Sequence, residues 1–519
     1  MKSEVMCLPE HLSALMRGDA YPHPVEEVRL IETHISWVLL TGEWAYKIKR
    51  PVAFPFVDLR SPERRAFFCE EELRLNRRFA PQLYVEVCDI TESEGGARIS
   101  GIGRAIDHAV KMLQFPTECG LDRLLLANAI APEVLERFGA ELADLHRELP
   151  LVDDNEPWGK AETVCRAVLE NLSECERAAR IFSRTEVPGS LRTTLEKRLA
   201  RSKELLSIRR ERGFVRECHG DLHARNVVLY DSELLAFDCM EFEPAFRWID
   251  VAQEIAFLWM DLCRHGREAH AHAFLSGYLS QNGDYDGCAL IRLYAAHCAL
   301  VRAKIVALEA AQSNETPEIE AARSRFDGYM AWVRDSLAAK QPRLILMSGW
   351  SGSGKTWLAK RVAPRLGAIH LRSDVERKRL AGLAEVDRAD SEILSGLYAR
   401  EKSTQVYEHL ATCASSCLAG GFTAVVDATF LMREDRAHFL QLAKRLHIEP
   451  VLIRCQAPEE VLRERIVGRQ NEGGDPSDAT LPVLEWQQSH ADAVGEDEPF
   501  KVIDIDTNRA DAVDMLLPP

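Results

Sequence analysis

A glycine-rich segment near residue 350 has the residue types that hold a nucleotide phosphate. Residues 349–356 are Gly-Trp-Ser-Gly-Ser-Gly-Lys-Thr, which fits the pattern G-x-x-x-x-G-K-[ST]. The turn would surround phosphate oxygens with N–H groups, Lys355 would reach the β- and γ-phosphates, and Thr356 would ligate Mg²⁺. An apolar run (343–348) before it and a helical pattern (357–366) after it disfavour an incidental turn. The expected nucleotide contacts are Gly349, Ser351, Gly352, Ser353, Gly354, Lys355 and Thr356.

Two carboxylates follow later apolar runs at positions suited to phosphoryl transfer. Asp374 comes directly after the short strand expected at 369–371, where it could accept a proton from a substrate hydroxyl. The same residue could also be the N-cap of the next helix. Asp427 ends the buried strand expected from residue 423, a position that suits Mg²⁺. The sequence therefore predicts a base at Asp374 and a metal ligand at Asp427.

Arginines on the following helices could hold anionic groups. Arg377 and Arg436 each lie shortly after one of these carboxylates and are predicted to contact the substrate. Arg465 and Arg469 lie at helical spacing before a stretch rich in Gly, Asp and Pro, residues 471–478. This combination predicts a lid whose arginines reach the transferred phosphoryl group. A solvated basic helix face is the alternative.

A second group of polar residues lies in the first half of the chain. Residues 219–226 are His-Gly-Asp-Leu-His-Ala-Arg-Asn, placed between two apolar strands, and Asp238 follows the next strand. Asp221 could orient and deprotonate a hydroxyl, while Asn226 and Asp238 could hold Mg²⁺. His223 is a further candidate for substrate contact. The alternative, a polar turn in a hairpin, does not account for Asp238 at this spacing.

The elements around these residues suggest two kinds of architecture. Residues 31–40, 44–49, 85–90 and 105–115 are predicted strands, and 62–79 is a predicted helix with Ser61 and Pro62 at its start. From about residue 132 to residue 337 the pattern is mainly helical. After residue 342, strands and helices alternate as in a parallel α/β domain. We therefore expect two domains, 1–338 and 342–519.

The first half resembles the aminoglycoside phosphotransferase family, whose catalytic loop has the form HGDxHxxN. This resemblance implies a bilobal, protein-kinase-like α+β fold. It implies that Lys47 pairs the nucleotide phosphates and that Glu72 is its partner, with Lys49 and Glu71 as rival assignments. It also implies that Met112 lies in the strand that holds adenine. Residues 33–36 occupy the place of a glycine-rich phosphate loop.

Residues 343–507 resemble the small-molecule kinase and zeta-toxin branch of P-loop proteins, which includes gluconate-kinase-like enzymes. The resemblance implies a P-loop NTPase fold with a parallel sheet flanked by helices. It also implies phosphorylation of a hydroxyl group. In its whole order the chain is similar to bacterial proteins that fuse the two kinds of domain.

Composition limits the remaining possibilities. The 519 residues exceed the size of one hydrophobic core, and the net charge of −16 makes nucleic acid an unexpected partner. The 14 cysteines never form a CxxC pair, and the N-terminus lacks a signal-peptide pattern, so a cytoplasmic protein without membrane attachment is expected.

Together these features predict a bifunctional kinase. Each site would use ATP and Mg²⁺ to phosphorylate a hydroxyl of a small molecule. An ATP-binding regulatory protein with slow ATPase activity is one alternative, and a C-terminal polynucleotide kinase is another. The acceptors and the oligomeric state stay open at this point.

Overall fold

The computed structural model describes residues 8–54, 57–180, 182, 189–312, 316–383, 400–472 and 479–517. The chain divides into two compact units. The first unit comprises residues 1–129, 148–160 and 208–254, and the second comprises 130–147, 161–207 and 255–519. Among the helices in these described ranges, none is both long and apolar enough to cross a lipid bilayer.

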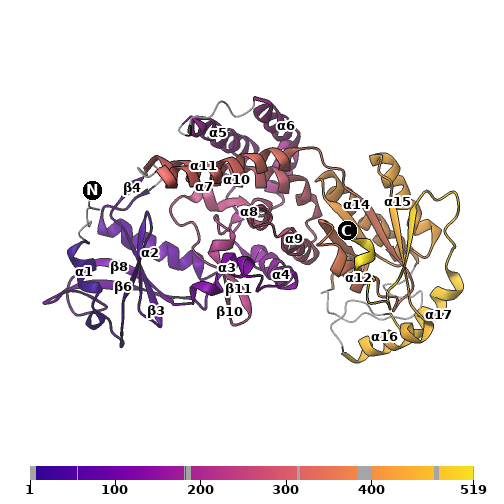
Figure 1. Cartoon of the computed structure of the whole chain (residues 1–519), viewed down its shortest axis with the longest axis horizontal. Helices are drawn as coiled ribbons and strands as arrows, with labels where there is room; N and C mark the ends of the chain where they lie inside the picture. Colours follow the sequence, from indigo (N-terminus) through magenta and orange to yellow (C-terminus); the bar gives the residue numbers. More distant parts are fainter. Residues whose placement is uncertain are drawn as a thin grey trace. The chain divides into compact units, whose positions relative to one another are not determined.

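The first unit is built on an antiparallel sheet, which has six strands in the described residues, in the order β1-β2-β3-β8-β6-β7 (Figure 1). Tight turns join β1 to β2, β2 to β3 and β6 to β7, whereas β3 and β8, which pair in the middle of the sheet, lie far apart in the sequence. The predicted strand at 31–40 is divided by a turn at residues 33–35. The strands are β1 (Arg29–Glu32), β2 (Ser36–Leu40), β3 (Trp44–Lys49), β6 (Tyr84–Ser93), β7 (Gly96–Ile99) and β8 (Ala105–Leu113).

Helix α2 (Pro62–Asn76) packs against β6 and β8. It begins where the sequence predicted, because the Ser61 hydroxyl accepts the N–H of Arg64 and Pro62 occupies the first turn. Its buried face mixes apolar residues such as Phe68 with the carboxylate Glu72, which is fully buried. The helix therefore carries a charged group into the core beside the sheet.

The polar loop at residues 218–226 leaves one two-stranded ribbon and enters another. Strand β9 (Val215–Glu217) pairs with β12 (Trp248–Asp250), whereas β10 (Val227–Tyr230) pairs with β11 (Glu233–Ala236). The loop is therefore not the turn of a hairpin. Smaller elements of this unit are α1 (Glu10–Leu15), β4 (Ala53–Phe54), β5 (Val57–Asp58), α3 (Leu121–Leu126) and α7 (Pro244–Arg247).

Long helices make up the earlier part of the second unit. The helical pattern predicted up to residue 337 ends in two helices, α10 and α11, which pack against each other, and α5 also packs on α10. The helices lying wholly or mainly in this unit are α4 (Pro132–Glu148), α5 (Ala161–Ala179), α6 (Gly189–Glu211), α8 (Val251–Arg264), α9 (Glu268–Asn282), α10 (Cys288–Gln312) and α11 (Thr316–Leu337).

The later part of the second unit, coloured orange to yellow in Figure 1, contains a parallel sheet. Its five described strands have the order β14-β15-β13-β16-β17. Strands β13, β14 and β15 are largely buried because helices cover both faces of such a sheet, whereas the edge strand β17 is mostly exposed. The strands are β13 (Leu344–Ser348), β14 (Ala368–Arg372), β15 (Thr423–Asp427), β16 (Val451–Gln456) and β17 (Lys501–Asp506). The helices are α12 (Lys355–Val362), α13 (Ser373–Leu380), α14 (Arg400–Ala419), α15 (Arg433–Leu446), α16 (Glu459–Glu472) and α17 (Leu481–His490).

Candidate active sites

The turn between β13 and α12 has the backbone of a phosphate-binding loop. Gly349, Gly352 and Gly354 have φ values of 145°, 81° and 80°, which side-chain-bearing residues rarely adopt. Space also requires glycine, because a Cβ atom at Gly349 would lie 2.4 Å from the carbonyl oxygen of Cys455 and one at Gly352 would lie 2.6 Å from that of Leu462. The predicted glycines therefore shape the loop.

Lys355 folds back over this loop. Its Nζ donates to the carbonyl oxygens of Gly349 and Trp350, both at 2.9 Å. Burial lowers the pKa of Lys355, although the charges of Asp427 and Asp374 oppose the change. The lysine side chain thus lies along the turn, where a bound phosphate oxygen could accept its hydrogen bonds in place of the two carbonyl oxygens.

Asp427 lies at the carboxyl end of β15, next to the loop. His370 Nε2 is 3.3 Å from Asp427 Oδ2, and the Thr356 hydroxyl also bonds this carboxylate. Burial raises the pKa of Asp427, but the hydrogen bonds and the charges of His370 and Lys355 outweigh burial, so the net pKa is lowered. Asp427 and Thr356 thus present adjacent oxygen atoms, the ligand type that Mg²⁺ prefers.

The loop opens into a cavity of about 1390 Å³. Asp374 lies in the first turn of α13 and faces this cavity, and the N-cap position of that helix belongs to Arg372 instead. Most predicted residues of the second site therefore meet around one space. Those that line it are Ser351, Gly352, Gly354, Lys355, Thr356, Asp374, Arg377, Asp427, Arg465 and Arg469.

The two arginines of α16 differ in their contacts. Arg465 Nη1 donates to the carbonyl oxygen of Gly352 at 3.3 Å and to the hydroxyl of Thr507 at 3.1 Å. Arg469 has Nε and Nη2 buried without a hydrogen-bond partner among the residues that the structure describes. Buried donors need partners, so an anion such as a phosphate fits this cavity. The rest of the predicted lid, 473–478, lies outside the described residues.

Arg436 does not take the predicted place beside the substrate. Its side chain is 1% exposed, and Nε and Nη2 donate to the two carboxylate oxygens of Glu498 at 2.7 and 2.9 Å. Nη1 donates to the carbonyl oxygens of Phe430 and Leu431. It does not line the cavity as the described residues define it. Its guanidinium instead holds the segment after β15 to the loop before β17.

Gln487 and Asp435 also line the cavity and were not predicted from the sequence. The Gln487 side chain accepts the N–H of Ser351 at 2.8 Å and so fixes the phosphate loop from α17. Asp435, in the first turn of α15, has its pKa raised to about 7 by burial, against a hydrogen bond from Tyr407. Asp435 could have been found as an acidic residue beyond the carboxyl end of β15. No sequence signal connected Gln487 to a loop 136 residues away.

In the first unit the loop after β9 brings Asp221 and Asn226 together. Asn226 Nδ2 lies 3.2 Å from Asp221 Oδ2 and 3.1 Å from its carbonyl oxygen, and His223 Nε2 lies 3.5 Å from the same carboxylate. The chain turns sharply at Gly220, whose φ is 86°. A Cβ atom there would lie 2.8 Å from the carbonyl oxygen of Phe246. The loop thus presents one carboxylate flanked by an amide and an imidazole.

Asp238 is held in an unusual backbone conformation. Its φ is 65°, and its N–H donates to the Tyr84 hydroxyl at 3.1 Å. The next N–H, from Cys239, donates to the Asn76 side chain at 2.9 Å. Strained backbone held on both sides is common at functional sites. These bonds fix the direction of the predicted metal ligand.

The two rival lysines of β3 occupy different places in one ionic network. Lys47 Nζ lies 2.7 Å from Glu72 Oε1 and also contacts Asp238. Lys49 contacts the other oxygen of Glu72 and the carboxylate of Glu241. Lys47 is 13% exposed whereas Lys49 is completely buried. Because only Lys47 reaches Asp238, the geometry favours Lys47 as the nucleotide lysine.

Charge pairing in this network shifts several pKa values. Burial disfavours the charged form of Lys47, but Asp238, Glu72 and Glu241 outweigh burial and hold its pKa well above the ordinary value. Burial likewise opposes ionisation of Asp238, and Lys47 still lowers its pKa. Burial raises the pKa of Glu241 to about 7 in spite of Lys49. Glu241 was not foreseen, and its position three residues after Asp238 carried no signal.

Glu71, the rival to Glu72, lies in a different ionic cluster. It pairs with Arg74 at 2.8 Å and with Arg247 at 3.7 Å. The helix period places Glu72 toward the sheet and Glu71 to its side. Glu72 is therefore the carboxylate that can act with Lys47.

Met112 is placed inside the sheet rather than at a free strand edge. Strand β8 pairs there with β3 on one side, opposite Ala45, and with β6 on the other, opposite Tyr84. The side chain of Met112 is buried in a core cluster. Its backbone is thus paired within the sheet, which disfavours Met112 as the residue that contacts adenine. The strand ends at Leu113, so the residues after it are better placed.

Residues 33–35 form the turn between β1 and β2. The Thr33 hydroxyl accepts the N–H of Ser36 at 2.9 Å and donates to its carbonyl oxygen at 3.0 Å. Arg50 Nη1 donates to the carbonyl oxygen of Thr33 at 2.6 Å. The turn is therefore closed by its own hydrogen bonds.

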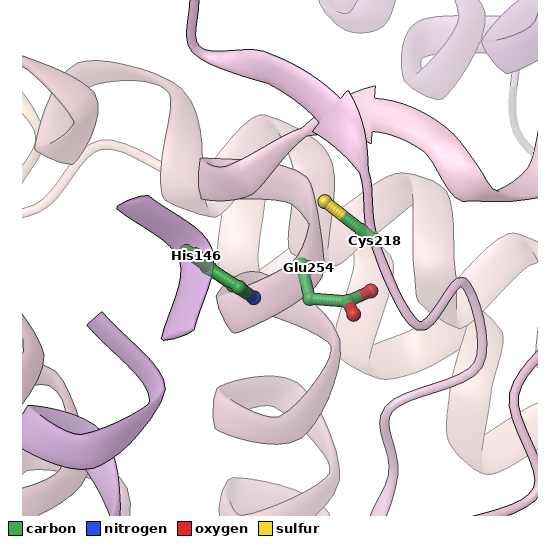
Figure 2. Close-up of side chains that lie close together, drawn as sticks. All are labelled: His146, Cys218 and Glu254. Atoms are coloured by element: carbon green, nitrogen blue, oxygen red, sulfur yellow. The ribbon is translucent and has the colours of Figure 1, made fainter. Parts of the chain in front are cut away.

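Glu254 supports the loop that carries Asp221. Figure 2 shows Glu254, on α8, close to Cys218 at the start of this loop. The two Glu254 oxygens accept the N–H groups of His219 and Gly220 at 2.6 and 3.1 Å. Burial raises the pKa of Glu254 to about 7, although these hydrogen bonds oppose the change. In the sequence, Glu254 is a single carboxylate within the apolar segment 251–260, and this contrast could have identified it.

The raised pKa of Glu254 predicts a dependence of stability on pH. A carboxyl group that binds its proton more tightly when folded stabilises the fold at low pH, and this stability is lost as pH rises through about 7. Relative to Glu254→Gln, the wild-type free energy of unfolding should fall by on the order of 3 kcal/mol between about pH 4 and pH 8. Urea unfolding at several pH values measures this, with the exposed Glu233→Gln as control. A difference from Glu254→Gln that stays constant with pH would contradict the prediction.

Comparison with family models assigns both parts of the chain. Residues 56–291 match the model of the phosphotransferase enzyme family, and residues 344–494 match the model of an AAA domain. The chain joins a phosphotransferase-family domain to an AAA-family domain. The protein-kinase-like fold of the former and the P-loop NTPase fold of the latter are those predicted from the sequence. Such domains support phosphotransfer activity.

The comparisons also found a relative that matches most of the chain and solved structures that match parts of it. An uncharacterized protein of Mycobacterium tuberculosis is 29% identical over 484 residues, which cover 91% of this chain and 94% of the relative. A choline/ethanolamine kinase family protein from Mesorhizobium loti is 11% identical over 61% of this chain and 94% of its own, with a TM-score of 0.33. A gluconokinase from Sinorhizobium meliloti is 20% identical over 34% of this chain and 90% of its own, with a TM-score of 0.22.

The family boundaries divide the two sites between the two domains. The phosphotransferase-family match includes Glu72, Asp221 and Asp238, whereas Lys47 precedes it. The AAA-family match includes the phosphate loop, Asp374, Asp427 and both arginines of α16. The former also extends through α9 and the short turn that follows, residues 285–287.

Proposed function

We propose that this protein is an ATP-dependent kinase with two sites, each of which transfers the γ-phosphate of ATP to a hydroxyl group of a small molecule. The observation that carries the proposal is that Lys355, Asp374 and Asp427 line one cavity. A nucleotide-binding protein without transfer would need the phosphate loop but not an additional carboxylate, such as Asp374, lining the same cavity. In the first site the same types of side chain, carboxylates and a lysine, come from a loop, a strand and a helix.

In the second site each side chain has one proposed task. Asp374 accepts the proton of the attacking hydroxyl, and Arg377 holds the acceptor in position. Lys355 and the loop N–H groups bind the phosphates, while Arg469 neutralises the charge that develops during transfer. The Arg469 donors, which have no hydrogen-bond partner among the described residues, support nucleotide binding here. The oxygen pair of Thr356 and Asp427 supports Mg²⁺ binding.

In the first site Asp221 has the task of the base. Asn226 and Asp238 supply the oxygens that would hold Mg²⁺, and Lys47 binds phosphate oxygens once its contact with Asp238 is exchanged for nucleotide. When bound at either site, Mg²⁺ neutralises phosphate charge. His223, 3.5 Å from Asp221, orients this carboxylate toward the hydroxyl acceptor.

The experiment that tests the proposal follows γ-phosphate transfer by the purified full-length protein. Sugars, aminoglycosides, nucleosides, oligonucleotide ends and fractionated cell extract serve as acceptors. The wild type is compared with Asp221→Asn and with Lys355→Ala. We expect products that disappear in one variant only, because each variant disables one site. ATP binding at both sites without product from any acceptor pool would contradict the proposal and favour a regulatory protein.

A further inference from the structure

The short helix α13 has two different polar faces. Asp374 and Arg377 line the cavity of the second site. Glu376 and Arg379 lie in the same helix, and the side chain of Glu376 is completely buried. An eight-residue helix is too short to be stable alone, so its position depends on what holds it. The contacts that Glu376 and Arg379 make with other elements therefore determine the position of Asp374.

Glu376 receives hydrogen bonds from three elements in the described part of the chain. The hydroxyl of Tyr285, in the turn after α9, lies 3.1 Å from Oε1. Arg379 donates to both carboxylate oxygens, at 3.0 and 3.1 Å, and His409 Nε2, on α14, lies 3.0 Å from Oε2. Burial opposes ionisation, but His409 and Arg379 lower the pKa of Glu376. The carboxylate is charged and has donors on both oxygens, as a structural anchor requires.

Arg379 extends the anchor to the end of α9. It donates to the carbonyl oxygens of Gln281, at 3.1 Å, and of Ser280. These carbonyls belong to the last turn of the helix, whose acceptors lack partners within the helix itself. Gly283 ends α9 in the left-handed conformation, and a Cβ atom there would lie 2.9 Å from the Arg379 side chain. Arg379 thus caps α9 while holding Glu376.

A second line of contacts leads from α9 to the predicted metal ligand. Strand β14 is the edge of the parallel sheet, and α9 packs against it. The Ser276 hydroxyl accepts the N–H of His370 at 3.3 Å, a group on the edge strand. The His370 side chain in turn lies 3.3 Å from Asp427. Thus α9 supports the elements that carry both Asp374 and Asp427.

The packing around these contacts is dense. Trp259, on α8, meets Phe422 with ring centroids 5.5 Å apart, and both side chains are buried. Arg292, on α10, donates to the carbonyl oxygen of Gly421 at 3.0 Å. A Cβ atom at Gly420 would lie 2.3 Å from the carbonyl oxygen of Cys288, so the two backbones touch. Dense packing of this kind holds the hydrogen-bonded groups in register.

We propose that α9 and the turn after it contribute to the second site by holding α13 in place, and that Tyr285 is a positioning residue for α13. By sequence match, α9 and Tyr285 belong to the phosphotransferase-family domain, yet they hold the helix that carries the AAA-family domain's base. Tyr285 and the carbonyls of Ser280 and Gln281 keep Asp374 and Arg377 facing the cavity. The inference deepens the proposed function and rests on it.

The test is Tyr285→Phe in the full-length protein, which removes one hydroxyl and keeps the ring. We expect kcat for the transfer that depends on Lys355 to fall about tenfold, because small displacements of a reacting group are costly. The KM for ATP should stay unchanged, because the phosphate loop does not contact Tyr285. Hydrogen exchange of the amides in residues 373–380 should become faster, a result that requires no turnover.

The matched control is Tyr278→Phe. Tyr278, in α9, is buried like Tyr285, and its hydroxyl lies 2.8 Å from Nδ1 of His146 on α4. This control should lose similar stability while keeping wild-type kcat and wild-type exchange of α13. Equal kcat and equal α13 exchange in Tyr285→Phe and Tyr278→Phe would overturn the inference and leave the proposed function intact. If Lys355→Ala transfers as well as the wild type, the proposed function itself fails, and α13 exchange alone then decides whether Tyr285 anchors the helix.

Discussion

The variant Asp374→Asn is expected to reduce phosphoryl transfer at the second site by about 10²- to 10⁴-fold, the usual contribution of a positioned general base. Asparagine has nearly the same shape but cannot accept the proton. The affinity for ATP should change less than about threefold, because Lys355, Arg465 and the loop N–H groups are untouched. Transfer is measured in single turnovers, and ATP affinity is measured by calorimetry with the same preparations.

A carboxylate outside the cavity provides the control for this experiment. Asp497 is exposed and pairs with Arg433, so Asp497→Asn should transfer at the wild-type rate. Retained transfer in Asp374→Asn would show that Asp374 is not the base. Asp435 would then be the next candidate, because it lines the same cavity and its pKa is raised to about 7 by burial.

The pair Lys47→Met and Lys49→Met should separate catalysis from stability in the first unit. Lys47→Met is expected to lower transfer at the first site by about 10²- to 10³-fold, since one charge that stabilises the transition state is lost. Lys49→Met should instead cost about 3 to 5 kcal/mol of unfolding free energy, because it leaves Glu72 and Glu241 buried without their shared cation. Product formation and urea unfolding are measured for both variants.

The two lysines serve as controls for each other, because they lie on the same strand and contact the same Glu72. The opposite outcome would contradict the assignment. If Lys49→Met loses transfer at unchanged stability while Lys47→Met keeps it, Lys49 is the nucleotide lysine and the contact of Lys47 with Asp238 is structural.

The sequence was informative where the residues that form a site lie close together along the chain. The strand, the glycines and the helix that make the phosphate loop lie within about twenty residues, and Asp221, Asn226 and Asp238 lie almost as close together. The choice between Lys47 and Lys49 could not be made in this way. Residues two apart on a strand share a face, so only the distant partners Asp238 and Glu241 distinguish the two lysines.

Long-range pairing explains the predictions that the structure disfavours and those that were missing. Arg436 follows a strand end just as Arg377 does, but Glu498, 62 residues later, takes up its guanidinium. Met112 has the apolar character of its strand, and the pattern does not show that the strand is paired on both sides. Gln487 and Tyr285 act on residues far along the chain, and a local pattern contains no information about such partners.

The contact between Gly420 and Cys288 also limits which residue the chain can have at position 420. A free-standing kinase domain is under no pressure to keep a glycine at this surface position, and most side chains would be accepted there. Once α10 lies against it, even a methyl group collides with the Cys288 carbonyl oxygen at 2.3 Å. The close approach of α10 therefore requires glycine at position 420, and even Gly420→Ala is expected to push α10 away from the end of α14. Relatives in which α10 packs in the same way are expected to have glycine at this position.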